Sequence, residues 1–207
     1  MMKVGLTGNY GMGKSSVAAM FSRLGALTID SDEIVASLLN EESVKGRIMG
    51  LLGVKALDPK GSLDKKYIAQ RVFTNKALRK ELEALIHPLV FHTVECLMKK
   101  VRDRNRIIIV EVPLLFEGGY QNRFDRTITV CADRKTALSR LRKSGISQKD
   151  ALARLRNQMD IRTKKRLADY RIENSGTRRQ TEAQVRAIYS LLVNENERVV
   201  SKGQRRS

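Results

Sequence analysis

The feature that most restricts this chain is a glycine-rich stretch near its start. Residues 8–15 read Gly-Asn-Tyr-Gly-Met-Gly-Lys-Ser, which fits the pattern G-x-x-x-x-G-K-[ST] in full. The stretch lies between an apolar strand pattern at residues 3–7 and an apolar helix pattern that begins near Lys14. In this order, the loop N–H groups and the helix N-terminus point at a bound anion. The stretch therefore predicts a nucleoside-triphosphate site.

Each position of this loop has an expected task. Gly8 and Gly13 let the backbone curl, Lys14 places a charge on the β- and γ-phosphates, and the Ser15 hydroxyl ligates Mg²⁺. The expected ATP-binding residues of the segment are Gly8, Asn9, Tyr10, Gly11, Met12, Gly13, Lys14, Ser15 and Ser16. The alternative, a chance glycine-rich turn, does not account for the complete motif in its strand–helix context. The motif alone does not choose among GTPases, motor ATPases and small-molecule kinases.

Strand and helix patterns alternate along the rest of the chain. We expect strands at residues 3–7, 27–30, 107–112, 127–131 and 170–173. The third is apolar almost throughout, as in a parallel strand that is covered on both faces. In the helical stretches between them, Pro88 is expected to kink or break one helix, and Ser147 resembles the start of a capping box. The alternation predicts an α/β fold of three layers with a parallel five-stranded sheet, similar to P-loop NTPases and nucleoside monophosphate kinases.

A chain of 207 residues without an internal linker is expected to form one domain with insertions. The stretch between the second and third strands is mostly helical and too long for one crossover, so it predicts a substrate-binding insertion. A later, very basic stretch predicts a lid. The expected parts are a core (about 1–33, 105–134 and 167–200), the insertion (about 34–104), the lid (about 135–166) and a disordered basic tail (201–207).

Two aspartates end the second predicted strand, at the sheet edge where ligands bind in open α/β sheets. A carboxylate of Asp30 or Asp32 at this edge can accept the proton of an attacking hydroxyl. The same residues precede a helical pattern, so helix capping explains them equally well. Both interpretations stay open, and one aspartate could serve each purpose.

The predicted lid concentrates cations that could stabilise a transferring phosphoryl group. They are Arg140, Arg142, Lys143, Arg154, Arg156, Arg162, Lys164 and Lys165. A closing lid would also exclude water, which competes with the acceptor. We expect two or three of these side chains to contact ligand and the others to be solvated.

Other features limit the function classes. Residues 75–78 lack the Asp of a guanine-reading N-K-x-D motif, and the third strand ends in Glu111, a weak match to a Walker-B aspartate. His87 and His92 have no partners at metal-ligand spacing, and Cys96 and Cys131 form no disulfide pattern. No signal peptide or membrane span is evident, so we expect a cytoplasmic protein.

The net charge of +18, from 40 Lys and Arg against 22 Asp and Glu, raises nucleic acid as a partner. The charges are dispersed and aromatic residues are only 5% of the chain, whereas base stacking needs aromatic platforms. We therefore favour a solvated basic surface that serves a small polyanionic substrate, and expect no nucleic-acid partner.

Six segments, in this order and spacing, resemble one family. They are residues 5–17, residues 29–32, residues 61–64 with Phe73 and 82–88, residues 113–117, a lid pattern through Arg154, Gln158, Lys164 and 168–169, and residues 174–176. Together they are similar to the dephospho-coenzyme A kinase family, from Val4 to about Gly176. The first segment is generic, and the order of the other five is specific.

The resemblance implies ATP-dependent phosphorylation of the ribose 3′-hydroxyl of dephospho-coenzyme A, with Mg²⁺, by a monomer or weak homo-oligomer. It implies Asp32 as the base or orienting carboxylate, assisted by Lys14 and Arg140, and places Asn174 and Gly176 near the adenine. The substrate contacts that it implies are Asp32, His87, Pro113, Leu114, Leu115, Phe116, Glu117, Arg154, Gln158 and Lys164.

Several positions depart from the family pattern. Met12 and Ser16 stand where Ser and Thr are expected, Glu111 stands where Asp is usual, and the stretch at Lys143 is one residue short with Lys in place of Arg. Two alternatives are weighed against this family: another small-molecule kinase, such as a nucleoside monophosphate kinase, and a basic nucleic-acid-binding P-loop ATPase. The segments at 87–88 and 113–117 argue against the first.

Overall fold

The computed structural model describes residues 1–103, 105–156 and 158–204. Arg104 in the predicted insertion, Asn157 in the predicted lid and residues 205–207 of the predicted tail lie outside the described residues. The chain forms two compact units, one of residues 1–30 with 103–207 and one of residues 31–102. For comparison, the sequence placed the insertion at about 34–104.

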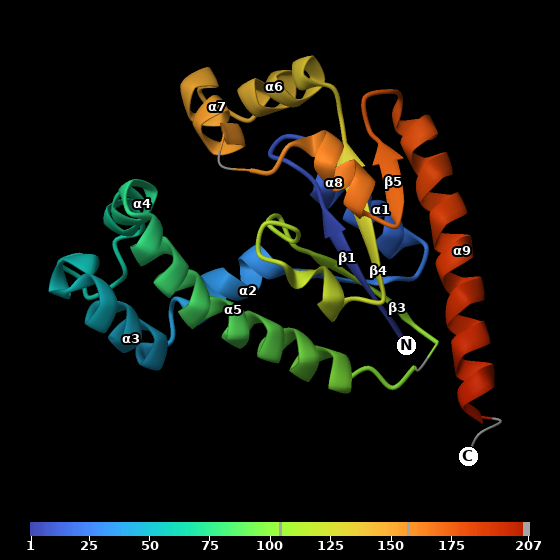
Figure 1. The fold of residues 1–207 in the computed structure, drawn as a ribbon, viewed down its shortest axis with the longest axis horizontal. Helices are drawn as coiled ribbons and strands as arrows, with labels where there is room; N and C mark the ends of the chain where they lie inside the picture. The colour runs from blue at the N-terminus through green and yellow to red at the C-terminus, as the bar shows by residue number, and fades with distance from the viewer. Residues whose placement is uncertain (104, 157, 205–207) are drawn as a thin grey trace. The chain divides into compact units, whose positions relative to one another are not determined.

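The first unit is built on a parallel sheet whose strands appear as arrows in Figure 1. The strands are β1 (Met2–Thr7), β2 (Leu27–Asp30), β3 (Ile107–Glu111), β4 (Arg126–Cys131) and β5 (Tyr170–Glu173). Their order across the sheet is β2-β3-β1-β4-β5, and every pairing is parallel. The predicted five-stranded parallel sheet is therefore confirmed.

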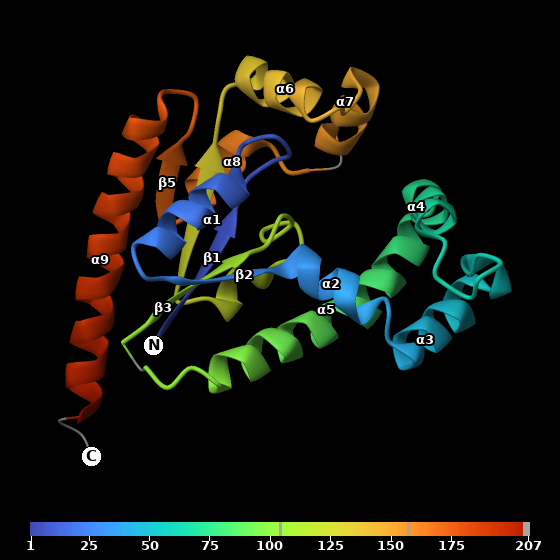
Figure 2. The same ribbon diagram turned by 180° about the vertical axis from the view of Figure 1, so that it is seen from behind.

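One face of the sheet is covered by α1 (Lys14–Arg23) and α9 (Arg178–Gln204), which pack side by side (Figure 2). Alternate strand residues point to this face, as the two-residue period of a strand requires. The resulting core contains Val4, Leu6, Ile107, Ile109, Ile128, Val130 and Ile172 from the strands, with Val17, Phe21, Val185, Ile188 and Leu192 from the helices. This core holds the end of β1, and with it the phosphate loop, in a fixed place.

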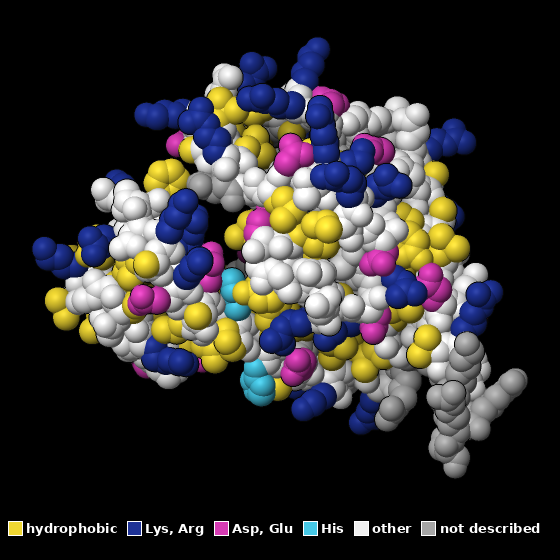
Figure 3. All heavy atoms as spheres, in the orientation of Figure 1, with side chains coloured by type: hydrophobic (Ala, Val, Ile, Leu, Met, Phe, Trp, Pro, Cys, Tyr) yellow, Lys and Arg dark blue, Asp and Glu magenta, His cyan; other side chains and the backbone are white. Residues whose placement is uncertain are grey.

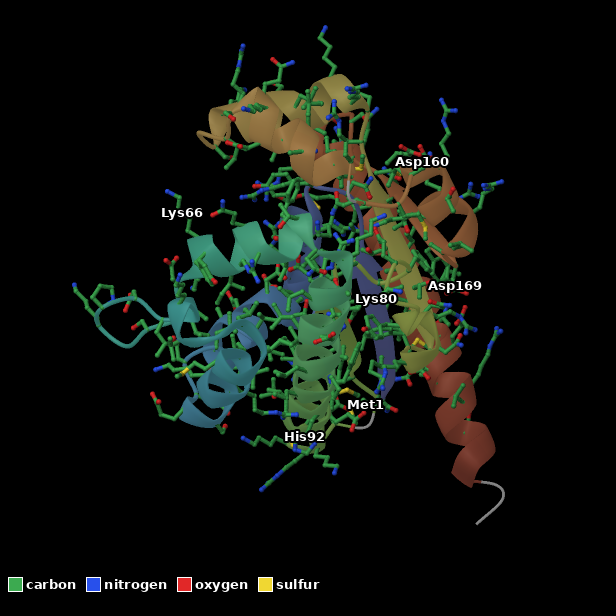
Figure 4. The ribbon with its side chains drawn as sticks, turned by 60° about the vertical axis from the view of Figure 1, so that its left-hand side comes forward. Met1, Lys66, Lys80, His92, Asp160 and Asp169 are labelled. Atoms are coloured by element: carbon green, nitrogen blue, oxygen red, sulfur yellow. The ribbon has the colours of Figure 1, made fainter. Side chains whose placement is uncertain are left out.

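The opposite face carries α8 (Ile161–Leu167) and the segment that follows β3. That segment approaches β1 so closely that a Cβ on Gly5 would lie 2.4 Å from Leu115 Cδ1. Asp160 and Asp169, labelled in Figure 4, flank α8. Asp160 caps its first turn, and Asp169 Oδ2 accepts from both the backbone N–H and the hydroxyl of Thr127 at 2.7 Å, so both ends of α8 are fixed.

The predicted lid region contains α6 (Arg134–Lys143) and α7 (Gln148–Arg156). Asp133 caps α6 by accepting from Thr136 N. The structure shows one half of the capping box expected at Ser147, because Ser147 Oγ accepts from Asp150 N (3.1 Å); the Asp150 carboxylate accepts from the Ser147 hydroxyl (2.7 Å). Figure 3 shows Lys and Arg side chains gathered over the part of the surface where Figure 1 places these two helices.

The second unit is helical. Its elements are α2 (Ser31–Leu38), α3 (Glu42–Leu52), the 3-10 turn η1 (Val54–Ala56), α4 (Lys65–Thr74) and α5 (Lys76–Lys99), and α2, α3 and α4 all pack on α5. Of the kink or break expected at Pro88, the break is wrong, because α5 continues through this residue. Buried neighbours on both sides, Ile86, Val90 and Phe91, compensate for the one helical hydrogen bond that a proline removes.

The predicted tail also differs from the structure. Helix α9 extends to Gln204, so residues 201–204 continue the helix instead of beginning a disordered end. Ser201 Oγ bonds the carbonyl of Glu197 at 2.6 Å, one turn back. The added helical turn keeps the backbone groups of this polar segment satisfied. Within the described ranges, no helix combines the length and apolarity needed to cross a membrane.

Candidate phosphate-transfer site

The glycine-rich loop leaves β1 at Thr7 and enters α1 at Lys14. Gly13 is the N-cap residue of α1 and has a left-handed conformation, with φ at 84° and ψ at 34°. A Cβ on Gly13 would lie 2.4 Å from Asn174 Nδ2, so both the backbone and the space require glycine. The loop therefore has the curled backbone and the helix N-terminus that phosphate binding needs.

The two residues that begin α1 both make contacts at this loop. Lys14 Nζ donates to the Gly8 carbonyl at 2.9 Å, which places the ammonium across the loop opening. Ser15 Oγ donates to Glu111 Oε2 at 3.1 Å. Glu111 is buried at the end of β3, and Asp30 at the end of β2 is its neighbour in register. Hydroxyl and carboxylate oxygens are thus gathered at the carboxyl edge of three adjacent strands.

Arg140, Asn174 and Thr181 form a network of hydrogen bonds that contacts the loop at Met12. Arg140 on α6 donates to the Asn174 carbonyl at 2.7 Å and, more weakly, to the Met12 carbonyl at 3.5 Å. Asn174, just after β5, is buried, and its Nδ2 donates to the Met12 carbonyl at 2.9 Å. Its Oδ1 accepts from the buried Thr181 hydroxyl at 3.0 Å. Arg140 and Asn174, both expected to bind ATP, thus contact the loop at Met12, whereas Gly176 is exposed.

Asn9 and Tyr10 connect the loop to the end of the predicted lid. Tyr10 N donates to Gln158 Oε1 at 2.8 Å, and Arg154 NH1 donates to the Tyr10 hydroxyl at 2.7 Å. The Arg154 guanidinium also lies 4.8 Å from the centroid of the Tyr10 ring, within the range of a cation–π contact. Asn9 Nδ2 donates to the Met159 carbonyl at 3.0 Å. Arg154 and Gln158, expected as substrate contacts, lie against the phosphate loop.

The segment 113–117 is more buried than expected for a surface that contacts substrate. Leu115 is fully buried and Phe116 nearly so, and only Leu114 is well exposed. Leu115 packs against β1 at Gly5, so it is a core residue and not an accessible contact. Pro113 and Glu117 are partly exposed, and both bind Lys164.

Lys164 also differs from expectation. Its side chain has no exposed surface, and its ammonium donates to the Pro113 carbonyl and pairs with Glu117 Oε1, each at 2.9 Å. Burial lowers the pKa of the Lys164 ammonium, and the hydrogen bond and charge of Glu117 oppose this shift. In this conformation a side chain without exposed surface is out of reach of a substrate, and the contacts of Lys164 are all within the chain.

Two expected site residues belong to the second unit. Asp32 is exposed in the first turn of α2, two residues after the end of β2. His87 is half-buried on α5, and burial lowers the pKa of its imidazole while the charge of Glu83 opposes this shift. The acidic first turn of α2 is compatible with both interpretations of the aspartate pair.

The sequence did not identify several residues of the site. Glu111 was considered a weak candidate because it is not Asp, and the structure places its carboxylate against the Ser15 hydroxyl at the end of β3. Thr181 carried no signal, because a threonine in a helix is not distinctive. In the first unit, burial raises the pKa of the Cys131 thiol to about 12, in agreement with a small buried side chain.

A parallel sheet with a G-x-x-x-x-G-K-S loop after β1, a carboxylate at the end of the adjacent strand and an arginine over the loop is the architecture of a P-loop kinase. The family model described as dephospho-CoA kinase matches residues 2–180. The chain belongs to the dephospho-CoA kinase family. It is therefore a kinase that uses ATP to phosphorylate the ribose 3′-hydroxyl of dephospho-CoA, the last step of CoA synthesis.

Individual relatives agree with this family. The chain is 35% identical over 193 residues to the dephospho-CoA kinase of Aquifex aeolicus (strain VF5), covering 93% of this chain and 98% of that protein. It is 37% identical over 192 residues to the dephospho-CoA kinase of Symbiobacterium thermophilum, covering 91% and 80%. The resemblance found in the sequence is confirmed, and the two alternative functions are set aside.

Solved structures show the same fold. The crystal structure of TT1252 from Thermus thermophilus matches with a TM-score of 0.82 and 30% identity, covering 93% of this chain and 97% of that one. The dephospho-CoA kinase from Campylobacter jejuni matches with a TM-score of 0.68 and 26% identity, covering 94% and 98%.

Proposed function

We propose that this chain carries out its family's reaction with the triphosphate of ATP on the loop 8–15. Lys14 is assigned to the β- and γ-phosphates and Arg140 to the charge that develops in transfer. The observation that carries this proposal is the gathering of Lys14, Arg140 and Asn174 around one glycine loop. Helix N-terminus, ammonium and guanidinium together supply the positive potential that phosphoryl transfer requires.

We infer that Mg²⁺ is held beside Ser15 and Glu111. Both offer oxygen, the donor that Mg²⁺ prefers, and the two side chains are already in hydrogen-bond contact at 3.1 Å. Mg²⁺ usually takes only one or two protein ligands together with substrate phosphates, so this small donor set fits. When bound, the ion would neutralise charge on the phosphate oxygens. Glu111, longer by one methylene than the usual Asp, reaches the Ser15 hydroxyl directly.

Asp32 is proposed as the base or orienting carboxylate for the ribose hydroxyl. Support comes from its place two residues after β2, whose last residue, Asp30, is in register with Glu111. A ribose hydroxyl is a poor acid, and base assistance contributes about 10²- to 10⁴-fold to such steps. Leu114, Glu117, His87, Arg154 and Gln158 remain proposed substrate contacts, with Gly176 near the adenine.

A coupled assay of ADP formation tests the proposal. With Mg²⁺ and ATP, we expect turnover with dephospho-CoA and none above background with AMP, CMP or GMP, which a nucleoside monophosphate kinase would phosphorylate on the 5′-phosphate. Transfer to the 5′-phosphate of AMP at a comparable rate would overturn the acceptor assignment. Phosphorus NMR of the product should locate the new phosphate on the 3′-oxygen of the ribose.

We also propose that the protein acts in the cytoplasm as a monomer or weak homo-oligomer. Sedimentation at several protein concentrations tests the second part. A stable dimer at nanomolar concentration would contradict it.

A further inference from the structure

One buried ammonium group joins parts of the first unit that are far apart in sequence. Lys164 Nζ bonds both the Pro113 carbonyl and Glu117 Oε1, each at 2.9 Å. The backbone of the same residue is held on the sheet, since Thr129 Oγ1 donates to its carbonyl at 3.2 Å. A buried charge is unfavourable unless it is paired and hydrogen-bonded, so these partners fix where the ammonium lies.

The first partner leads to the phosphate loop. The Pro113 carbonyl accepts from Lys164 and also from Thr7 Oγ1 at 3.1 Å. Thr7 is the last residue of β1 and directly precedes Gly8. A carbonyl oxygen has two lone pairs, so it can accept from both donors at once. The position of Lys164 is thereby tied to the start of the loop.

The second partner leads to the end of the predicted lid. Glu117 Oε1, which pairs with Lys164, also accepts from Met159 N at 2.9 Å. The Met159 carbonyl accepts from Asn9 Nδ2 at 3.0 Å. Met159 lies between α7 and α8, so its backbone is held by the segment 113–117 on one side and by the phosphate loop on the other.

Two simpler roles for Lys164 do not account for this arrangement. Direct substrate contact is ruled out for this conformation by the absence of exposed surface. Simple space filling would be served by a methionine, but a methionine would leave the Glu117 carboxylate without its cation and the Pro113 carbonyl with one donor fewer.

We propose that Lys164 is a positioning residue. It holds the segment 113–117, and the connection between α7 and α8 at Met159, against the phosphate loop without touching either substrate. The inference rests on the proposed function in one respect, namely that Arg154 and Gln158, which lie shortly before Met159 in the sequence, contact ligand. If the Lys164 ammonium is removed, the connection at Met159 shifts, and Arg154 and Gln158 are displaced from the positions in which they contact ligand.

The main test is Lys164→Met, which keeps the side-chain length and removes the charge. We expect kcat to fall about 10²-fold, as a displacement near 1 Å can cause. KM for each substrate should stay within about threefold, because Lys164 touches neither. The matched control is Arg166→Met, which removes an exposed cation from the same helix and should leave kcat unchanged.

A second readout does not depend on activity. Hydrogen exchange of the Met159 amide, read by NMR of the nucleotide-free protein, should become at least about tenfold faster in Lys164→Met, while amides of β3 keep their protection. This separates the inference from the proposed function, because a wrong site assignment would leave the exchange result intact. Equal loss of protection throughout the sheet would show general destabilisation and would overturn the positioning role.

If Lys164→Met does not fold, Glu117→Gln carries the test, since it removes the same ion pair while keeping volume and an acceptor oxygen. We expect the same loss of kcat and the same faster exchange of the Met159 amide, at smaller amplitude. KM is not compared for this variant, because Glu117 is itself a proposed substrate contact. Where both variants fold, the losses should not multiply in the double variant, because both break one network. Turnover within twofold of the parent in either folded single variant, or multiplicative losses in the double, would overturn the proposal.

Discussion

The Ser15 hydroxyl and the Glu111 carboxylate are joined by a hydrogen bond of 3.1 Å, although the residues lie 96 positions apart in the sequence. The contact follows from the sheet order, since β3 lies next to β1 and Glu111 pairs in register with Leu6. Parallel pairing brings the carboxyl end of β3 beside the start of α1. The sheet therefore gathers the oxygen donors of the proposed Mg²⁺ site.

Glu111→Gln should raise the Mg²⁺ concentration needed for half-maximal rate and lower kcat by about 10²-fold, because a neutral amide binds the cation more weakly. A Mg²⁺ titration of the rate measures this. Glu111→Asp keeps the charge and should retain most of the activity. An unchanged Mg²⁺ dependence in Glu111→Gln would remove Glu111 from the site.

Asp32→Asn should lower kcat by about 10²- to 10⁴-fold with little change in ATP affinity, because it removes the base and leaves the phosphate loop intact. Steady-state kinetics and nucleotide titration separate the two effects. Lys14→Ala is the comparison, and should abolish transfer while the circular dichroism spectrum stays unchanged. If Asp32→Asn turns over at the parent rate, Asp32 is a helix-capping residue.

Thr181→Val tests whether the Thr181 hydroxyl holds Asn174 in its contact with the phosphate loop. The change keeps shape but leaves the buried Asn174 Oδ1 without its donor, which costs about 1–3 kcal/mol of unfolding free energy. KM for ATP should rise, because Asn174 then holds the Met12 carbonyl less well. Urea unfolding and kinetics measure both. Arg140→Ala, by contrast, should reduce transfer without a comparable loss of stability.

The Tyr10–Arg154 contact has two parts that mutation can separate. Tyr10→Phe removes only the hydroxyl that accepts from Arg154 and should change kcat less than about threefold. Tyr10→Leu also removes the ring under the guanidinium, worth about 0.5–1 kcal/mol at exposed sites, and should have the larger effect. Equal effects of the two variants on kcat would contradict a contribution from the ring.

The lowered pKa of His87 predicts a pH dependence of stability. Between its folded pKa and the usual 6.5, the unfolded chain binds more protons, so the unfolding free energy rises with pH in this window. Below the folded pKa the penalty for charging the half-buried ring is complete. The difference in urea midpoint between parent and His87→Gln should therefore grow in favour of the parent as pH rises through the window. Parallel curves would show that His87 does not titrate with folding.

Local patterns were sufficient for the elements of the sheet. Local apolar patterns, continuous in β3 and alternating with polar residues in β2 and β5, located all five strands, and the loop motif located the phosphate site, because both depend on neighbours in sequence. The error at Pro88 has the opposite origin, since packing against other helices outweighs the local cost of a proline.

The sequence by itself determined the phosphate loop at Gly8–Ser15 with its flanking strand and helix, the parallel α/β class and the family. Each of these depends on residue patterns over short distances and on the order of motifs along the chain. Only the tertiary structure decided that Glu111 meets Ser15, that Leu115 is core, and that Lys164 is a buried link and not a substrate contact. Whether a polar side chain meets a ligand or another part of the chain depends on which distant segments the sheet order places beside it. Burial then selects the partner, because a charge removed from water is tolerated only where hydrogen bonds replace the water.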